Sequence, residues 1–303
     1  MSDVPQNPAL STTRPLDVTA TALVVLLCLS WGFNQVAVKL AIPDIPPLIQ
    51  GAIRSAGAGL IVWLWTRARG IPLHLDDGTL RAGIATGLLF SVEFALIYRG
   101  LLFTSASRAV LFLYTAPFFV VLGSHWLVPG DRFRLAQWIG LALSFAGIAV
   151  AFGVPTSEDP RQIIGDLMLL GGGMAWAGTT LMIKTSGLNR ASAEKTMLYQ
   201  LVLSIPILTV GAFIFGERIT HMPGAVAIGS LAYQTVWVVS VTFVIWFGLI
   251  VRYSASRLSA FTFLTPLFGV AAGHLVLGDP ITPGFALAAA MVIAGLILVN
   301  RPR

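Results

Sequence analysis

The chain contains an internal duplication. Ser105-Ala-Ser-Arg108 returns unchanged as Ser254-Ala-Ser-Arg257, an offset of 149 residues. Residues that follow the two tetrapeptides also pair at this offset: Phe112 with Phe261, Tyr114 with Phe263, Pro117 with Pro266, and His125 with His274. The sequence therefore predicts two copies of one folding unit, the first over residues 18–153 and the second over residues 154–303.

Nearly all of both copies is apolar. Of the 303 residues, 56% are hydrophobic and 11% are charged, whereas soluble proteins carry roughly 25% charged residues. Apolar runs of about 20 residues cross the hydrocarbon core of a bilayer as α-helices. We expect an all-α integral membrane protein with ten such helices, at residues 18–41, 45–66, 79–102, 105–128, 134–153, 163–185, 193–216, 225–251, 255–277 and 281–300. Residues 1–17 are expected to form a disordered cytoplasmic tail.

The basic residues predict the orientation of the helices. With the N-terminus inside the cell, thirteen of the 19 Lys and Arg residues fall in cytoplasmic segments and six fall elsewhere, as the positive-inside rule requires. Both termini are then cytoplasmic. Because each copy has five helices, an odd number, the second copy enters the membrane from the opposite side. The sequence thus predicts a 5+5 inverted repeat around a central cavity, an arrangement found in secondary transporters.

Several other classes of protein find no support in the sequence. It contains no P-loop, no His-Glu-x-x-His motif and no Gly-x-Ser-x-Gly motif, which argues against ATP-driven transport and against two common classes of hydrolase. The one cysteine, Cys28, lies in an apolar run, and no Cys/His cluster indicates a metal site. The net charge of +6 is spread over short loops, so nucleic acid is not an expected partner. We expect no enzyme activity and no cofactor, and the oligomeric state is not defined.

Several motifs resemble those of a known family. They are Trp31-Gly-Phe-Asn-Gln-Val-Ala-Val-Lys39, Arg54, Leu102-Phe-Thr-Ser-Ala-Ser-Arg108, Pro117 and Ala146-Gly147. Over nearly its whole length the sequence resembles EamA-type carriers of the drug/metabolite transporter superfamily. It is most similar to the bacterial inner-membrane exporters of aromatic amino acids, also called methyl viologen exporters. The second copy departs from the first, with Gln200 in place of Arg54 and Thr242 in place of Glu93.

This resemblance implies a secondary transporter that exports amino acids, chiefly aromatic ones, by alternating access across the bacterial inner membrane. It also implies that the first four helices of each copy enclose the cavity and that substrate enters from the cytoplasm. Efflux of lipophilic cations and other drugs is the alternative. A nucleotide-sugar or lipid-linked carrier would need more basic cavity residues than Arg54 alone. A channel would show a ring of like charges, and a pore formed by several copies remains an alternative.

Arg54 and Glu93 are the charges set deepest in the predicted helices. Each lies about nine residues from the outer end of its helix, which is about 13 Å deep at 1.5 Å per residue. An ionisable residue at that depth usually faces a cavity or a partner. One hypothesis is that Arg54 or Glu93 binds the charged ends of a zwitterion, or that Glu93 carries a coupling proton. Alternatively the two residues form a buried ion pair between neighbouring helices.

Polar and aromatic residues share faces of several predicted helices. Trp31, Asn34 and Gln35 lie on one face of the first helix, and Trp176 with Thr179 forms the matching face of the sixth. Such groups either bond a neighbouring helix or contact substrate. Aromatic stripes on the third and eighth helices either pack helices together or line a cavity. The expected substrate-binding residues are Trp31, Asn34, Gln35, Arg54, Glu93, Tyr98, Tyr114, Trp176, Thr179, Tyr199, Trp237 and Phe263.

Two further pairs of residues are related by the duplication. Pro117 and Pro266 lie inside the fourth and ninth predicted helices, where each removes a backbone donor. They act either as gating hinges or as fixed kinks. Arg108 and Arg257 fall in the first turn of the same helices, where the helix dipole disfavours a cation. We expect both arginine side chains to snorkel to the membrane interface.

Overall fold

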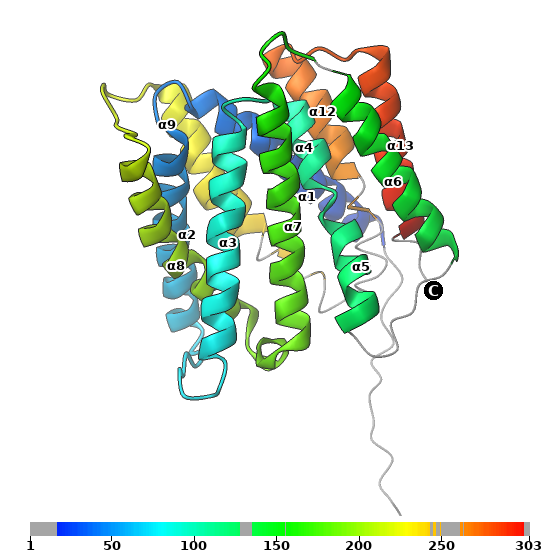
Figure 1. Cartoon of the computed structure of the whole chain (residues 1–303). Coiled ribbons are helices and arrows are strands. Elements are labelled where there is room, and N and C mark those ends of the chain that lie inside the picture. The colour runs from blue at the N-terminus through cyan, green and yellow to red at the C-terminus, as the bar shows by residue number, and fades with distance from the viewer. Residues whose placement is uncertain are drawn as a thin grey trace, which may run out of the picture.

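The computed structural model describes residues 17–127, 135–154, 156–242, 245, 246, 249, 261, 262 and 264–299. Residues 1–16 of the predicted tail, the second Ser-Ala-Ser-Arg tetrapeptide and Phe263 lie outside this part of the chain. Within it the regular structure is helical and contains no strand. Figure 1 shows the helices standing side by side in one bundle. The expectation of an all-α protein is therefore met for the described residues.

Most helices begin and end near their predicted positions. The first half of the chain forms α1 (Val18–Ala41), α2 (Pro47–Ala68), α3 (Leu80–Gly100), α4 (Ala106–Leu113), α5 (Ala116–Leu127) and α6 (Leu135–Gly153). The second half forms α7 (Gln162–Thr185), the 3-10 helix η1 (Gly187–Arg190), α8 (Ala193–Ile214), α9 (Ala225–Ala232), the π-helix η2 (Tyr233–Val241), α12 (Leu264–Leu277) and α13 (Pro283–Val299).

The described chain has seven helical segments that are long and apolar enough to cross a membrane, with α4 and α5 together forming one of them. Three shorter apolar segments accompany them, at Ala225–Val241, Leu264–Leu277 and Pro283–Leu298. This composition is that of a multi-pass membrane protein. The total of ten spans stays a prediction.

A break divides the predicted helix 105–128 into α4 and α5. Ser105 caps α4 by accepting the backbone N–H of Arg108 with its hydroxyl at 3.2 Å. Pro117 has no N–H to donate to the carbonyl of Leu113, four residues earlier, so the helical ladder is interrupted there. The chain becomes helical again at Ala116. The break brings the start of α5 to the wall of a central cavity.

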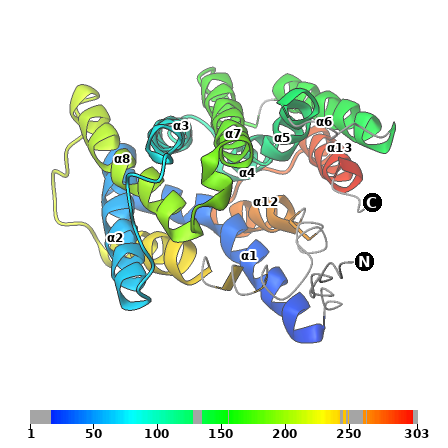
Figure 2. The same cartoon turned by 90° about the horizontal axis from the view of Figure 1, so that it is seen from below.

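Helices α2 and α8 form a tight pair at one side of the bundle, opposite the pair of α6 and α13 (Figures 1 and 2). Ser204 Oγ donates to Ser55 Oγ across the α2–α8 pair at 2.8 Å. One turn along, Gly59 lies against Leu201. Residue numbers rise along α2 as they fall along α8, so the two helices are antiparallel.

Glycines permit close packing in the pair of α6 and α13. Gly147 lies against Ala288, and Gly295 lies against Ser144. A methyl group added at either glycine would overlap the facing helix. Small residues let helix backbones approach closely, which is a common way of associating helices in a membrane. This pair is antiparallel by the same comparison of residue numbers.

The α6–α13 contact gives a test of the packing. Gly295→Ala should lower the free energy of unfolding by about 1–3 kcal/mol, because the added methyl group overpacks the contact. The matched control is Gly229→Ala on α9, where nothing lies within 4 Å of the added carbon. The control should leave stability unchanged or raise it slightly, since alanine is the better helix former. Thermal unfolding in detergent measures both variants, and equal melting temperatures would contradict the packing.

Candidate substrate-binding cavity

A cavity of about 350 Å³ lies among α1, α2, α3, α4, α5, α7 and η2. Small-molecule sites usually have volumes of about 300–1,000 Å³. Among the residues predicted to bind substrate or to gate, those that line it are Trp31, Asn34, Gln35, Arg54, Glu93, Tyr114, Trp176 and Pro117. The other described lining residues are Phe94, Ile97, Leu113, Val238, Trp246 and Thr262. Side chains from both halves of the chain thus meet in one small space.

Two of the predicted residues are engaged by neighbouring helices. Tyr98 is 1% exposed, and its hydroxyl donates to Oε1 of Gln234 at 2.6 Å. The indole Nε1 of Trp237 donates to Ser30 Oγ at 2.9 Å. Neither residue lines the cavity, and the polar group of each already has a partner.

Three more predicted residues do not line the cavity. The Tyr199 hydroxyl lies 3.1 Å from Thr79 Oγ1, and its ring lines a separate apolar pocket. Thr179 is buried one turn after Trp176, and its hydroxyl has no partner among the described residues. Pro266 is buried in the first turn of α12. Helical periodicity shows which residues share a face, but it does not show which face turns toward the cavity.

Arg54 and Glu93 reach the cavity from α2 and α3 and are 6% and 7% exposed. The Arg54 guanidinium carbon lies 4.1 Å from the centroid of the Phe94 ring, a cation–π contact. No ion pair joins Arg54 to Glu93 in the part of the chain that the structure covers. Nε and Nη1 of Arg54 have no hydrogen-bond partner there. The guanidinium therefore keeps hydrogen-bonding capacity for a ligand.

Aromatic rings form much of the cavity wall. Trp31 Nε1 donates to Thr242 Oγ1 at 3.0 Å, and its ring meets Trp246 edge-on with the ring centroids 5.4 Å apart. Trp176 meets Tyr114 in the same edge-to-face manner at 5.5 Å. Such pairs contribute about 0.5–1.5 kcal/mol beyond the burial of area. The rings are thus held in fixed orientations before any ligand arrives.

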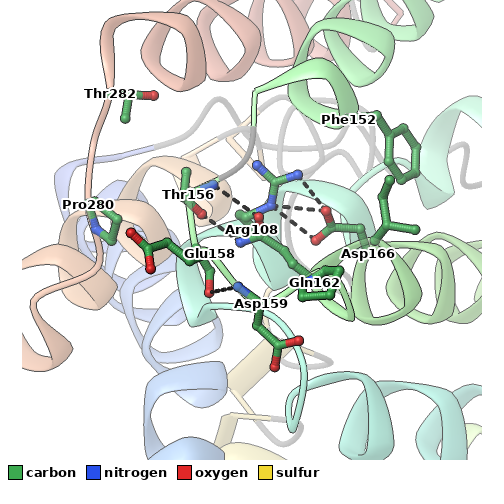
Figure 3. Close-up of a pocket in the computed structure, with 12 residues that line it drawn as sticks. Arg108, Phe152, Thr156, Glu158, Asp159, Gln162, Asp166, Pro280 and Thr282 are labelled. Atoms are coloured by element: carbon green, nitrogen blue, oxygen red, sulfur yellow. Dashed lines mark hydrogen bonds and ion pairs between the residues drawn. The ribbon is translucent and has the colours of Figure 1, made fainter.

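Helix α4 ends at the cavity, whose wall includes Leu113, and every residue of α4 is buried. Arg108 on this helix is 1% exposed, so the expectation that it snorkels to the interface is wrong. Its Nε donates to both carboxylate oxygens of Asp166 at 3.1 and 3.0 Å (Figure 3). Nη1 donates to the carbonyl of Val154 at 2.8 Å and Nη2 to that of Ala151 at 2.7 Å. Asp166 and the unpaired carbonyls that end α6 together compensate for burying the charge.

Other polar contacts lie around this ion pair. Lys39 Nζ donates to the carbonyl of Thr104 at 2.7 Å, and the Thr104 hydroxyl donates to Asp166 at 2.6 Å. The Asp279 carboxylate accepts the backbone N–H of Ser107 at 2.8 Å. We call Lys39, Thr104, Ser107, Arg108, Asp166 and Asp279 the closing network. It lies toward the end of the bundle where α1 ends and α2 begins.

A wider hollow of about 690 Å³ lies beside the closing network (Figure 3). Arg108 and Asp166 line it and face each other, and Gln162 Nε2 donates to Thr156 Oγ1 at 2.8 Å. Because these polar groups already bind one another, the hollow has less to offer a ligand than the smaller central cavity. The candidate binding site is therefore the central cavity.

Two signals in the sequence were overlooked. Asp166 is a carboxylate near the start of an apolar helix, and such a group requires a buried cation or a polar partner. Trp246 and Thr262 line the cavity, and at the duplication offset of 149 they are the counterparts of Ile97 and Leu113, which line it too. The offset leads from Ile97 and Leu113 to these two residues, but neither Ile97 nor Leu113 was a candidate.

The helical bundle and its central cavity define a multi-pass membrane protein with room for a small molecule. The model of the EamA-like transporter family matches the chain twice, over residues 18–153 and 163–301. The chain belongs to this family, as its motifs predicted. It is therefore a membrane transporter of the drug/metabolite transporter superfamily and not an enzyme.

Named relatives match over nearly their whole length. An uncharacterized transporter of Bacillus subtilis, YvbV, is 28% identical, and the match covers 95% of this chain and 93% of that protein. A probable amino-acid metabolite efflux pump of Escherichia coli is 25% identical, with coverage of 91% and 93%. A solved crystal structure of another protein shares the fold, with a TM-score of 0.67 at 18% identity over 93% of this chain and 97% of that one.

The closing network predicts a large difference between two aspartates. Asp166→Ala leaves Arg108 buried without its countercharge, so it should lower the free energy of unfolding by about 3–5 kcal/mol. Asp159 pairs with Arg161, whose side chain is 64% exposed, and such surface pairs contribute about 0–1 kcal/mol. Asp159→Ala is therefore the matched control. Unfolding in detergent compares the two variants, and equal losses of stability would contradict the buried pair.

Proposed function

We propose that this protein is a secondary transporter of the bacterial inner membrane that exports amino acids, chiefly aromatic ones, by alternating access. The observation that carries the proposal is the central cavity. It has aromatic walls, and it contains buried polar groups that have no partner among the described residues. In a family of transporters, such a cavity is the natural place for a substrate.

The helix pairs support a 5+5 inverted repeat. α2 and α8 are the second helices of the two proposed copies, and α6 and α13 are the fifth. Each pair is antiparallel, so a helix meets its own counterpart running the opposite way. Helices α2 and α8 begin and end 146 residues apart, the offset that pairs Arg54 with Gln200, and they meet near their middles through Ser55 and Ser204. This is the contact expected where a two-fold axis in the membrane plane passes between counterpart helices.

The closing network supports alternating access. In the orientation that the basic residues favour, the network lies at the external face and the cavity is reached from the cytoplasm. Export then requires the contacts around Arg108 and Asp166 to part while the cytoplasmic end closes. In an inverted repeat, each half can adopt the conformation of the other, which provides the outward-open state.

The walls of the cavity favour an aromatic substrate. The rings of Trp31, Trp176 and Tyr114 offer edges and faces for stacking with an aromatic side chain. The relative from Escherichia coli named as an amino-acid metabolite efflux pump supports amino acids as the class. Glu93 and the same rings would also attract a lipophilic cation, which is the alternative substrate, but the neighbouring Arg54 opposes a cation.

Transport by purified protein in liposomes tests the proposal. Liposomes loaded with labelled phenylalanine, alanine or methyl viologen should lose phenylalanine fastest. Flux of methyl viologen without any amino acid would favour the alternative substrate, and flux of none of the three would contradict the assignment. Repeating the assay with and without a pH gradient separates proton coupling from facilitated diffusion.

A pair of tryptophan variants tests the role of the walls. Trp176→Ala removes a ring that lines the cavity, so phenylalanine transport at low concentration should fall about tenfold, equivalent to about 1.4 kcal/mol of stacking. Trp63→Ala on α2 is the control, because Trp63 is 45% exposed and does not line the cavity. Equal effects of the two variants would contradict a substrate-stacking role for Trp176.

A further inference from the structure

Four buried polar atoms beside the cavity have no hydrogen-bond partner among the described residues. Two are donors, Nε and Nη1 of Arg54, and two are acceptors, Oδ1 of Asn34 and Oε1 of Gln35. All three residues line the cavity, and Arg54 and Gln35 are 6% and 5% exposed. A buried polar group that is left unpaired carries an uncompensated desolvation cost. A ligand that supplies the missing partners removes this cost.

The surroundings of these atoms are already ordered. The Phe94 ring, 4.1 Å from the guanidinium carbon, packs against Arg54. Trp31, on the same face of α1 as Asn34 and Gln35, has its indole N–H bound to Thr242. Of these four unpartnered atoms, the two donors therefore lie on α2 and the two acceptors on α1.

This division defines the head group of the ligand. A carboxylate is the best acceptor for a guanidinium, and an ammonium group offers three donors and no acceptor to the two amide oxygens. An α-amino acid carries both groups on one carbon. A cationic amine would leave Arg54 unpaired, and a carboxylic acid without an amine would leave Asn34 and Gln35 unpaired.

We infer that Arg54 binds the α-carboxylate of the transported amino acid and that Asn34 and Gln35 bind its α-ammonium, so the carrier rejects compounds that lack either group. This inference rests on the proposed function. The counterpart of Arg54 in the second half is Gln200, which is neutral, so the cavity has one anchoring wall. The side chain of the amino acid then extends toward Trp176 on α7.

Competition by analogues tests the inference in the unaltered protein. Efflux or counterflow of labelled phenylalanine in liposomes is measured against unlabelled phenylalanine, phenethylamine, which lacks the carboxylate, and 3-phenylpropionate, which lacks the amine. All three share the ring. Each analogue should compete about 10- to 100-fold more weakly than phenylalanine, because it leaves buried polar groups unpaired. Equal competition by either analogue would overturn the inference while leaving phenylalanine transport intact.

Variants test separately the residues that bind the α-carboxylate and those that bind the α-ammonium. Arg54→Gln, which copies the second half, should abolish the preference for phenylalanine over phenethylamine and retain the preference over 3-phenylpropionate. The double variant Asn34→Leu, Gln35→Leu should do the reverse. Arg161→Gln, at a side chain that is 64% exposed, is the control and should change neither preference.

The outcomes separate the inference from the proposed function. If the unaltered protein transports no phenylalanine, the proposed function is wrong. If the unaltered protein transports phenylalanine and the Arg54→Gln variant keeps both preferences, the inference alone is wrong. If a variant transports nothing, the thermal shift that each compound gives to the detergent-solubilised variant supplies the same comparison. Stabilisation of Arg54→Gln by phenylalanine but not by phenethylamine would then count against the assignment.

Discussion

Polar groups inside a bilayer have no water to bind, so each must be paired within the protein or face a cavity. Two deep arginines meet this constraint in opposite ways. Arg108 is 1% exposed and donates to Asp166 and to two backbone carbonyls. Arg54 is 6% exposed and has two nitrogens without partners among the described residues. The first stabilises the closing network, and the second is available at the cavity.

The duplication in the sequence accounts for the similar aromatic residues in the cavity wall. The differences between the two copies account for charged residues on one side only. Trp31 and Trp176 are counterparts, and each meets another aromatic ring edge-on. The charges are not duplicated, since Gln200 and Thr242 stand in the second half where the first has Arg54 and Glu93. Thr242 instead accepts a hydrogen bond from Trp31. A single charged wall limits the cost of burying ionisable groups, and in the binding mode proposed above it gives the ligand one orientation.

Much of the fold could be predicted from the sequence, because the length of an apolar run and the polar residues that separate such runs are local signals. The helix expected at residues 18–41 is Val18–Ala41, and the one expected at 193–216 is Ala193–Ile214. The π-helix Tyr233–Val241 was not predicted, because a π-helix differs from an α-helix in its hydrogen bonds and not in its apolar pattern. The break before Pro117 was expected as a bend, and it is a true interruption.

The site was only partly predictable, because contacts between helices are not local signals. From their depth, Arg54 and Glu93 were expected to face a cavity or a partner, and both line the cavity; their role in binding stays a prediction. The face that each helix turns inward depends on its neighbours. Tyr199 and Trp237 were expected to line the cavity, and neither does. The snorkelling predicted for Arg108 failed for the same reason, since its partner Asp166 lies on another helix and 58 residues away.

The central claim is that one cavity is reached from the two sides of the membrane in turn and is closed here by the network around Arg108. Labelling of a single cysteine tests it most directly. In a Cys28→Ser background, Val238→Cys places a thiol at the cavity wall, and a membrane-impermeant maleimide is added to vesicles from either side. The account predicts labelling from the cytoplasmic side in the unaltered network and new labelling from the external side when Asp166→Asn weakens it. External labelling with the network intact, or labelling from neither side, would contradict the account.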